Sequence, residues 1–220
     1  MSEEALKFKN SNPDLDYKNM SLNDLEKLPK HNGIINFKIS KTSFLMLNIL
    51  NDDSSVIKYF WKGSHDLASL DLWYNLSLKK GVFIDVGAHT GLYSLVSSRA
   101  NKDNQVISFE PYFLNMARLI TNLRLNGIFD KVKTILAAVS NFDGKTKFNI
   151  NSEKSYLSKG GKIDKNGIEV DVYALDNILF DRLDQTLRAI KIDTEGEDYK
   201  VLLGSEKLIS QYKPKIIIEV

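Results

Sequence analysis

Acidic side chains stand at or near the ends of three apolar segments of this sequence, where the chain would leave a buried sheet. Asp85 lies near the end of "VFIDV", Glu110 ends "QVISFE" and Asp193 ends "RAIKID". Carboxylates in such positions accept hydrogen bonds from hydroxyls, pair with ammonium groups or take up protons. The pattern predicts a binding site for a polar small molecule at the carboxyl ends of strands.

The loop that follows Asp85 narrows the choice of ligand. It is bounded by Gly87 and Gly91 and precedes an apolar-periodic segment. A dinucleotide site needs the spacing G-x-G-x-x-G, because its middle glycine lets the backbone approach a pyrophosphate. His89 stands at that middle position and Leu92 at the third. Pyrophosphate binding is therefore disfavoured, which argues against an NAD-dependent oxidoreductase.

A cofactor without phosphate groups fits this loop better. S-adenosylmethionine (SAM) has an amino group that pairs with a carboxylate, and ribose hydroxyls that need an acceptor. Glu110 stands where an acidic residue accepts hydrogen bonds from ribose hydroxyls in dinucleotide folds; the alternative is an exposed glutamate at a strand end. Asp85 either bonds the amides of the loop or meets the amino group of SAM, directly or through water.

If SAM is the cofactor and a hydroxyl the acceptor, methyl transfer is an in-line displacement, in which alignment of the two reactants can supply most of the acceleration. A base need only remove the proton of the hydroxyl, and the candidates are Asp193, Glu195 and His89. Lys191 shares a strand face with Asp193, and an ion pair between them would keep the pKa of Asp193 low. Asp193 and Glu195 have no evident third ligand, so we predict no metal site.

Strands and helices alternate along the sequence from Gly81 onward. The predicted strands are 82–86, 105–110, 132–139, 188–193 and 215–220, and the predicted helices are 91–100, 113–125, 175–180 and 198–209. This alternation predicts an α/β fold with a doubly wound, mostly parallel sheet and helices on both faces. Two weaker strands, 145–150 and 168–173, form an insertion that is either a solvated hairpin or a lid over the acceptor site.

The sequence before this domain is predicted to be an extension, residues 1–65, followed by a SAM-binding domain of residues 66–220. Residues 1–20 are expected to be loosely ordered, and Ser21 caps a short helix. Two or three antiparallel strands are predicted from segments rich in β-branched and aromatic residues, at 33–40, 42–49 and 55–61. Asp66 is expected to cap a helix over residues 67–78.

Four ordered blocks resemble the FkbM family of SAM-dependent methyltransferases over roughly residues 60 to 220: "FIDVGAHTGLYS", "VISFEPYFLNMARLITNLRLNG", "ALDNIL" and "IKIDTEGEDYKVLLGSEKLI". The resemblance implies the Rossmann-like class I methyltransferase fold and O-methylation of a sugar, glycan or small metabolite. It implies that Ala137 and Ala138 lie beside the adenine. The residues implied to bind SAM are Asp85, Gly87, Ala88, His89, Gly91, Glu110, Pro111, Ala137, Ala138 and Asp193.

The sequence departs from the family's pattern at three places. The family usually has asparagine where His89 stands, so His89 is either a base or a hydrogen-bonding substitute for that asparagine. Asp198 replaces a glutamate. The antiparallel strand pair that normally ends the fold has no counterpart before Val220, which would leave the edge of the sheet uncovered.

The composition excludes several classes of protein. The net charge is +2 and no run of five like charges occurs, so we predict neither a nucleic-acid partner nor a membrane-binding helix. The absence of cysteine excludes disulfides and thiolate chemistry. Without a signal peptide or an apolar run of about 18 residues, the chain is expected to be cytoplasmic.

The predicted partner is a small-molecule or carbohydrate acceptor, and the sequence leaves homo-oligomer formation open. A catalytically silent module that binds SAM or a glycan remains the alternative to an enzyme.

Overall fold

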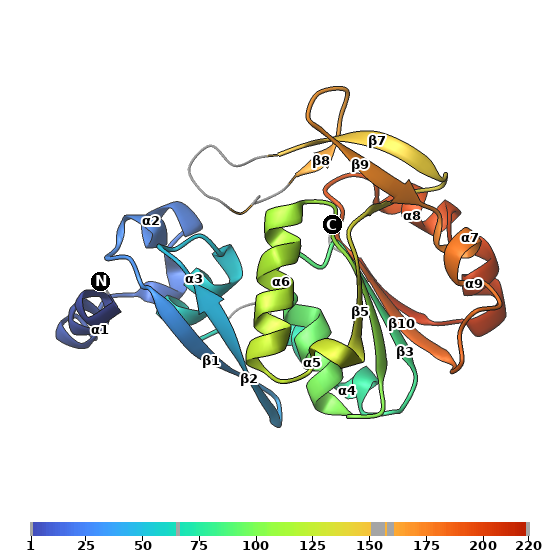
Figure 1. The fold of residues 1–220 in the computed structure, drawn as a ribbon. Coiled ribbons are helices and arrows are strands. Elements are labelled where there is room, and N and C mark those ends of the chain that lie inside the picture. The colour runs from blue at the N-terminus through green and yellow to red at the C-terminus, as the bar shows by residue number, and fades with distance from the viewer. Residues whose placement is uncertain (1, 65–66, 151–156, 158–160, 219–220) are drawn as a thin grey trace.

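The computed structural model describes residues 2–64, 67–150, 157 and 161–218 and has an α/β architecture (Figure 1). Its central sheet has the strand order β11-β10-β3-β4-β5, and every neighbouring pair is parallel. These strands are β3 (Val82–Val86), β4 (Gln105–Phe109), β5 (Val132–Ile135), β10 (Leu187–Ile192) and β11 (Lys215–Ile218). The predicted doubly wound parallel sheet is thus confirmed.

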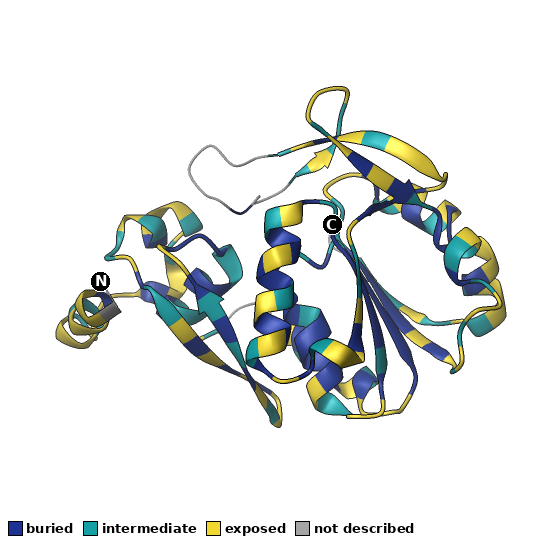
Figure 2. Ribbon diagram, viewed as in Figure 1, coloured by how far each residue is buried: buried dark blue, intermediate teal, exposed yellow. Residues whose placement is uncertain are grey.

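Helices cover both faces of the central sheet (Figure 1). One face carries α4 (Leu67–Ser77), α5 (Leu92–Ala100) and α6 (Phe113–Leu125), and the other carries α7 (Leu175–Leu179), α8 (Asp198–Leu203) and α9 (Glu206–Tyr212). Because side chains alternate along a strand, Phe83 of β3 joins the apolar cluster under the first helices and Ile84 joins the second cluster. Figure 2 shows the resulting run of buried residues along the central strands.

Two elements break where the sequence predicts one. The strand expected over residues 132–139 divides into β5 and β6 (Ala138–Val139), because the chain turns at Ala137, whose N–H bonds the carbonyl of Ile135. The helix expected over residues 198–209 divides into α8 and α9 at Gly204. A Cβ at Gly204 would lie 2.2 Å from the carbonyl oxygen of Ser140, so the helix passes too close to another segment for a side chain there.

The insertion forms a second, smaller sheet with the order β6-β9-β7-β8. It contains β7 (Gly144–Asn149), β8 (Lys162–Ile163) and β9 (Ile168–Tyr173). The two weaker strands predicted at 145–150 and 168–173 are confirmed as β7 and β9, which pair in antiparallel register. In Figure 1 this sheet lies over the carboxyl ends of the central strands. Most of the loop that would act as a lid, 151–156 and 158–160, falls outside the described residues.

The segment before residue 65 is more helical than predicted. It contains α1 (Ser2–Ser11), η1 (Tyr17–Asn19), α2 (Leu22–Lys27), β1 (Gly33–Ile39), β2 (Thr42–Asn48) and α3 (Ser54–Lys62). The prediction that residues 1–20 are loosely ordered is wrong, since α1 and η1 lie there. Ser21 caps α2 as predicted, by accepting a hydrogen bond from the N–H of Asp24, whereas the cap expected at Asp66 lies outside the described residues.

The third strand predicted in this segment, residues 55–61, is wrong, because these residues form α3. Asp53 begins the helix by accepting hydrogen bonds from the N–H groups of Ser55 and Val56, and Gly63 ends it with φ of 74°. These are the usual start and stop signals of a helix. Val56, Ile57 and Trp61 are buried at helical spacing, so the apolar period is that of a helix.

The hairpin of β1 and β2 packs against the central sheet and its helices. Phe37 and Phe44 belong to the same apolar cluster as Phe83 and Leu95. The domain boundary at residue 65 stays a prediction.

Polar side chains of α6 also hold the edge of β2. Asn122 accepts a hydrogen bond from the N–H of Leu47 at 2.9 Å, and Asn126 bonds both the N–H and the carbonyl of Leu45 at 2.9 and 2.7 Å. Spaced four residues apart, the two amides lie on one face of the helix and satisfy backbone groups that a neighbouring strand would otherwise pair.

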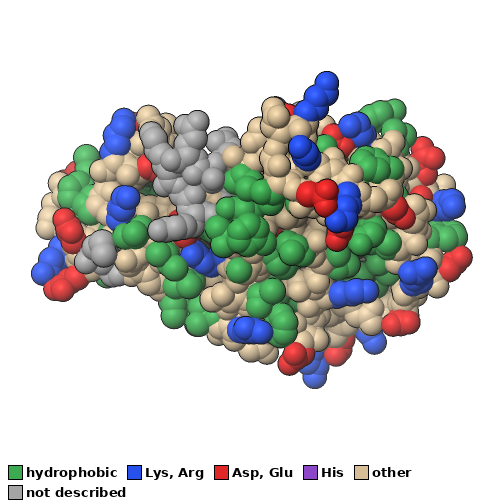
Figure 3. Space-filling model, turned by 45° about the horizontal axis from the view of Figure 1, so that its top comes forward, with side chains coloured by type: hydrophobic (Ala, Val, Ile, Leu, Met, Phe, Trp, Pro, Cys, Tyr) green, Lys and Arg blue, Asp and Glu red, His purple; other side chains and the backbone are tan. Residues whose placement is uncertain are grey.

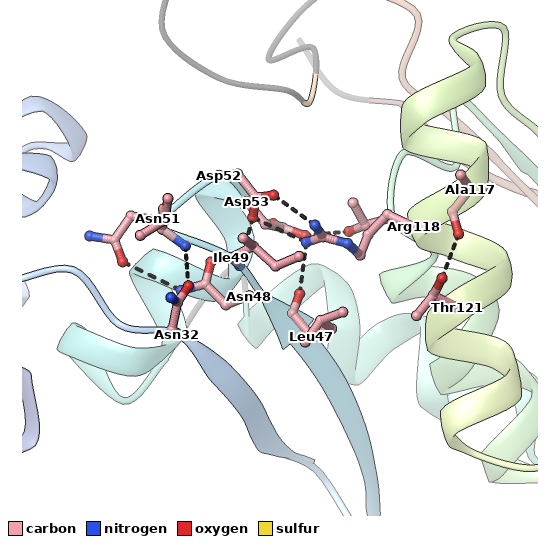
Figure 4. Close-up of polar contacts among 12 residues, drawn as sticks. Asn32, Leu47, Asn48, Ile49, Asn51, Asp52, Asp53, Ala117, Arg118 and Thr121 are labelled. Carbon is pink, nitrogen blue, oxygen red and sulfur yellow. Dashed lines mark hydrogen bonds and ion pairs between the residues drawn. The ribbon is translucent and has the colours of Figure 1, made fainter. Parts of the chain in front are cut away.

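A buried ion pair adds to this contact (Figure 4). Arg118 of α6 forms two hydrogen bonds with Asp52, at 2.7 and 3.0 Å, and a third with the carbonyl of Leu47. The exposed fractions of the two charged side chains are only 9% and 4%. The segment after β2 is therefore fixed on α6 by a bidentate pair that is shielded from water.

One face of the molecule carries charges of both signs. On the face shown in Figure 3, lysine, arginine, aspartate and glutamate side chains are interspersed around a central group of hydrophobic side chains. Among the described residues, no helix is long and apolar enough to cross a membrane.

Candidate active site

A cavity of about 930 Å³ opens at the carboxyl ends of β3, β4 and β10. In this fold the strand order reverses between β3 and β10, and such a switch point is where ligands bind in open α/β sheets. The cavity brings together most of the predicted site residues: Gly87, Ala88, His89, Glu110, Pro111, Ala137, Ala138, Asp193 and Glu195. The two that do not line it are Asp85, which is fully buried, and Gly91, which caps α5.

The loop after β3 is shaped by backbone geometry. Gly87 has φ of 71°, and a Cβ there would lie 1.8 Å from the carbonyl oxygen of Asp193. Gly91 has φ of 93° and begins α5. Only glycine adopts such angles without strain, and at Gly87 the close approach of the two strand ends excludes a side chain as well.

His89 also has a positive φ, of 50°. This left-handed conformation is uncommon for residues with a Cβ, and asparagine, aspartate and histidine tolerate it better than most. The geometry therefore gives a physical reason for histidine where asparagine is usual. The N–H of His89 donates to Oε2 of Glu110 at 2.8 Å, so the loop is fixed to the end of β4.

Glu110 is almost fully buried and binds the surrounding backbone. Besides His89, the N–H of Tyr112 and the amide of Asn115 donate to its Oε1, at 2.9 and 3.3 Å. Burial raises the pKa of Glu110, and the charge of His89 and these hydrogen bonds act in the opposite direction. A carboxylate has about four acceptor positions, so one remains beyond the three in use.

Lys191 lies at the centre of the polar groups behind the cavity. Its Nζ is 3.2 Å from Asp193 and 3.5 Å from Asp85, and it donates to the carbonyl of Gly87 at 2.8 Å. The predicted ion pair with Asp193 is thus confirmed. Burial alone would lower the pKa of Lys191, but the two carboxylates outweigh it, so the pKa lies above its ordinary value and the ammonium stays charged.

Asp85 is held from behind by a hydroxyl rather than by the loop. Ser94 of α5 donates to its Oδ2 at 2.6 Å and shares a second hydrogen bond with Ser108 of β4. Its Oδ1 is buried and has no hydrogen-bond partner within the described residues. Among those residues, the donors to Asp85 do not include the amides of the loop, so its buried charge faces chiefly Lys191.

Asp193 and Glu195 lie side by side on the cavity wall but differ electrostatically. Asp193 is paired with Lys191, whereas Glu195 has no ion pair within the described residues. Burial and the nearby carboxylates of Asp193 and Asp198 raise the pKa of Glu195, and Lys191 only partly opposes this. Asp198 itself binds the turn, accepting hydrogen bonds from the N–H and hydroxyl of Thr194.

The segment before residue 65 contributes to the same site, which the sequence analysis missed. The hydroxyl of Thr90, in the loop after β3, donates to Asp53 at 2.6 Å, and Asp53 also caps α3. One carboxylate therefore fixes both α3 and the glycine-bounded loop. The residues of α3 on the cavity wall are Ser54, Ser55, Lys58 and Lys62.

In the part of the chain that the structure describes, no group of three histidine, cysteine, aspartate or glutamate side chains could hold a metal ion.

The sequence model of one protein family matches most of this region. It is described as the methyltransferase FkbM domain and matches residues 85–220, which include the loop, Glu110, Lys191 and both acidic residues after β10. The chain belongs to the FkbM methyltransferase family. The cofactor of this family is SAM. No curated protein matches the sequence.

Solved structures resemble the FkbM domain weakly. A SAM-dependent methyltransferase from Agrobacterium tumefaciens is 14% identical, with 51% of this chain and 34% of that chain covered and a TM-score of 0.38. The tRNA (uracil-54, C5)-methyltransferase of Pyrococcus abyssi, in complex with S-adenosylhomocysteine, is 10% identical. The match covers 86% of this chain and 34% of that chain, with a TM-score of 0.41. A methyltransferase from Podospora anserina with bound S-adenosylhomocysteine (SAH) is 12% identical. The match covers 73% of this chain and 55% of that chain, with a TM-score of 0.41.

This chain thus spans about a third to a half of the length of these structures. Structural similarity this weak supports no further conclusion about the FkbM domain.

The residues of the FkbM cavity fit SAM. SAM carries a sulfonium, an ammonium and a carboxylate, so its net charge is positive, and Glu110, Asp193 and Glu195 line the cavity. Asp85, behind this wall, pairs with Lys191, and its Oδ1 has no hydrogen-bond partner within the described residues. A volume of about 930 Å³ has room for a cofactor and a second molecule, because ligand pockets typically measure about 300–1,000 Å³.

Proposed function

We propose that this chain transfers the methyl group of SAM to a hydroxyl of a sugar, glycan or small metabolite. The observation that carries the proposal is the cavity at the switch point of the sheet, where the glycine-bounded loop, Glu110 and the acidic residues after β10 share one wall. When bound, SAM supplies an electrophilic methyl group. The room left in the cavity is for the hydroxyl that receives it.

The residues proposed to hold SAM divide by chemistry. Glu110 accepts a hydrogen bond from a ribose hydroxyl through its remaining acceptor position, and Asp193 accepts one from the amino group. Gly87 and Gly91 shape the loop and leave its backbone amides near the ligand. The residues proposed to contact the adenine or the loop side of SAM are Ala88, His89, Pro111, Ala137 and Ala138.

Glu195 is the base that the electrostatics favour. The carboxylate of Asp193 is already engaged in an ion pair with Lys191. Glu195 is solvent-exposed on the cavity wall and its pKa is raised, which brings that pKa closer to neutral pH, where general bases work best. Asp193 then positions SAM, and His89 maintains the backbone of the loop.

Methyl transfer is tested by incubating the full chain with SAM labelled in its methyl group and a panel of sugars, glycosides and small hydroxylated metabolites. The expected result is labelled product with the methyl on oxygen, identified by NMR, and inhibition by S-adenosylhomocysteine. Label on carbon or nitrogen would contradict O-methylation. SAM binding without turnover on any member of the panel would favour the silent binding module.

Replacing Glu110 with glutamine should weaken SAM binding. The change keeps the shape of the side chain but converts one acceptor into a donor that opposes the N–H of His89 or Tyr112. A hydrogen bond to a charged group contributes about 1.5–3 kcal/mol, so the dissociation constant measured by calorimetry should rise by about tenfold or more.

Glu169→Gln is the matched control, because Glu169 lies on the surface and pairs only with Lys145 in the described part of the chain. Unchanged SAM affinity in folded Glu110→Gln protein would reject the ribose role of Glu110.

Replacing Glu195 with glutamine should remove a pH dependence. Because the base must be ionised, kcat/KM of the wild type should rise with pH through an apparent pKa above the ordinary value of a glutamate, about 4.3. In Glu195→Gln this rising limb should be lost, and kcat should fall by about 10²–10⁴-fold. The measurement is the pH profile of methyl transfer for both proteins.

The same raised pKa affects folding with a defined sign. The folded state binds the proton of Glu195 more tightly than the unfolded chain, so its contribution to stability is present at low pH and is lost as pH rises through the folded pKa.

Glu206→Gln, on the exposed side of α9, is the control for the pH profile of methyl transfer. A rising limb that persists unchanged in Glu195→Gln would assign the base to another group.

A further inference from the structure

The two sides of the cavity differ in charge. Glu110, Asp193 and Glu195 line the side formed by the strand ends, whereas Lys58 and Lys62 of α3 line the side formed by the N-terminal segment. Lys18 of η1 lines that side as well. Since SAM has a net positive charge, the acidic side suits it, and the basic side is left for the acceptor.

The lysines of α3 face the cavity because of their spacing. Ser55, Lys58 and Lys62 follow one another at intervals of three and four residues, which places them on one face of the helix. Lys58 and Lys62 are half-buried, so part of each aliphatic chain is covered. Such lysines keep their ammonium groups toward the open space while their methylenes pack on the protein.

These charges are not neutralised by neighbouring acids in the described structure. None of the ion pairs among the described residues includes Lys18, Lys58 or Lys62. Lys191, the other lysine on the cavity wall, is held between Asp85 and Asp193 and adds no comparable attraction for an anion. The basic side of the cavity thus depends on the N-terminal segment.

The backbone of α3 does not supply the anion site. Asp53 occupies the N–H groups of Ser55 and Val56, and its carboxylate stands at the start of the helix. An anion on this wall would therefore be bound by the ammonium groups of Lys58 and Lys62, farther along α3, with the hydroxyl of Ser55 as an additional donor.

We infer that the acceptor carries a phosphate group, which Lys58 and Lys62 bind with help from Lys18 while the hydroxyl to be methylated points toward the acidic side. Several lysines match a phosphate ester or diphosphate better than a single carboxylate, because the phosphate carries more charge and more acceptor oxygens. This inference rests on the proposed function, since it concerns the second substrate of the same cavity.

The phosphate site can be tested without knowing the acceptor. Calorimetric titration with inorganic pyrophosphate should show binding to the wild-type chain and at least tenfold weaker binding to the double variant Lys58→Gln/Lys62→Gln. The matched control is Lys102→Gln/Lys133→Gln, which removes the same charge from two exposed lysines outside the cavity wall. Equal pyrophosphate affinity in both double variants would overturn the inference.

A second set of titrations distinguishes this inference from the proposed function. SAM affinity should be nearly unchanged in Lys58→Gln/Lys62→Gln, because these lysines belong to α3, whereas the proposed SAM residues lie at the ends of the central strands and in the segments that follow them. If the wild-type chain did not bind SAM, the proposed function would be rejected. The pyrophosphate titrations would still show whether Lys58 and Lys62 form a phosphate site. A large loss of SAM affinity in this variant alone would place the lysines in the cofactor site and contradict their role toward the acceptor.

The source of the phosphate follows from four probes added to SAM-loaded protein: glucose 1-phosphate, UDP-glucose, glucuronate and glucose. Tighter binding of glucose 1-phosphate or UDP-glucose than of glucose supports the inference and separates a sugar phosphate from a nucleotide sugar. Tighter binding of glucuronate than of either phosphate compound would mean that the acceptor carries a carboxylate, and it would overturn the inference of a phosphate group. For a phosphorylated acceptor that turns over, the double variant should raise KM with little change in kcat, the signature of lost substrate binding.

Discussion

Gly87→Ala is expected to disrupt both the fold and SAM binding. The new methyl group would lie 1.8 Å from the carbonyl oxygen of Asp193, and the residue would keep a φ of 71°. A left-handed residue with a Cβ costs about 1–2 kcal/mol, and overpacking adds about 1–3 kcal/mol. The free energy of unfolding, measured with urea, should fall by about 2–5 kcal/mol, and remaining folded protein should bind SAM poorly because the ends of β3 and β10 must separate.

Gly127→Ala is the matched control for this prediction. Gly127 has a similar φ of 64°, but a Cβ there would meet nothing within 4 Å. The free energy of unfolding of this variant should fall only by the conformational cost, about 1–2 kcal/mol. The variant should bind SAM as the wild type does. Equal losses of stability in the two variants would show that the close approach of Gly87 to Asp193 does not constrain the site.

Arg118→Met is expected to destabilise the contact between α6 and the segment after β2. The exposed fractions of Arg118 and Asp52 are 9% and 4%, so the substitution removes the bidentate cationic partner of a buried carboxylate. Breaking a buried pair from one side costs about 3–5 kcal/mol. Because Asp53 follows Asp52 and binds Thr90 in the loop after β3, SAM affinity should fall along with the free energy of unfolding.

Two variants separate the buried charge from a general loss of contacts. In Arg118→Met/Asp52→Asn no charge remains buried, so the double variant should be more stable than Arg118→Met alone. Lys145→Met removes an ion pair with Glu169 whose side chains are 64% and 63% exposed, and it should change stability little. If the double variant were less stable than Arg118→Met, the buried charge of Asp52 would not be the cause of the destabilisation.

The central sheet could be predicted because its local signals agree with its tertiary structure. The strands are short apolar runs bounded by turns and separated by helices of clear period, and burial on both faces requires such runs. Predictions were wrong where the boundary of a helix or strand involves a contact with a distant part of the chain. At the break between α8 and α9, Gly204 lies against the backbone of Ser140, a contact that no local pattern around residue 204 reveals.

The N-terminal segment was predicted less well for a different reason. Residues 55–61 are rich in β-branched and aromatic side chains, and their composition favoured a strand. The cap at Asp53 and the stop at Gly63 were the stronger signals, since they define both ends of α3. The spacing of Lys58 and Lys62 becomes informative only once the helix is recognised.

The strand-end part of the site followed from the sequence because parallel strands bring their carboxyl ends to one edge. Glu110, Asp193 and Glu195 indeed share one cavity wall. The network around Lys191 was only partly foreseen, since its bond to the carbonyl of Gly87 requires the register of β10 with β3. The contact of Thr90 with Asp53 joins residues 37 positions apart and had no sequence signal.

Calorimetric titration of the full chain with SAM and, in parallel, with NAD tests the central claim most directly. We predict micromolar binding of SAM with one molecule per chain and no binding of NAD, because the strand-end side of the cavity is acidic and its loop has His89 where a dinucleotide site needs glycine. Binding of NAD without SAM, or of neither, would contradict the assignment of this cavity as a SAM site.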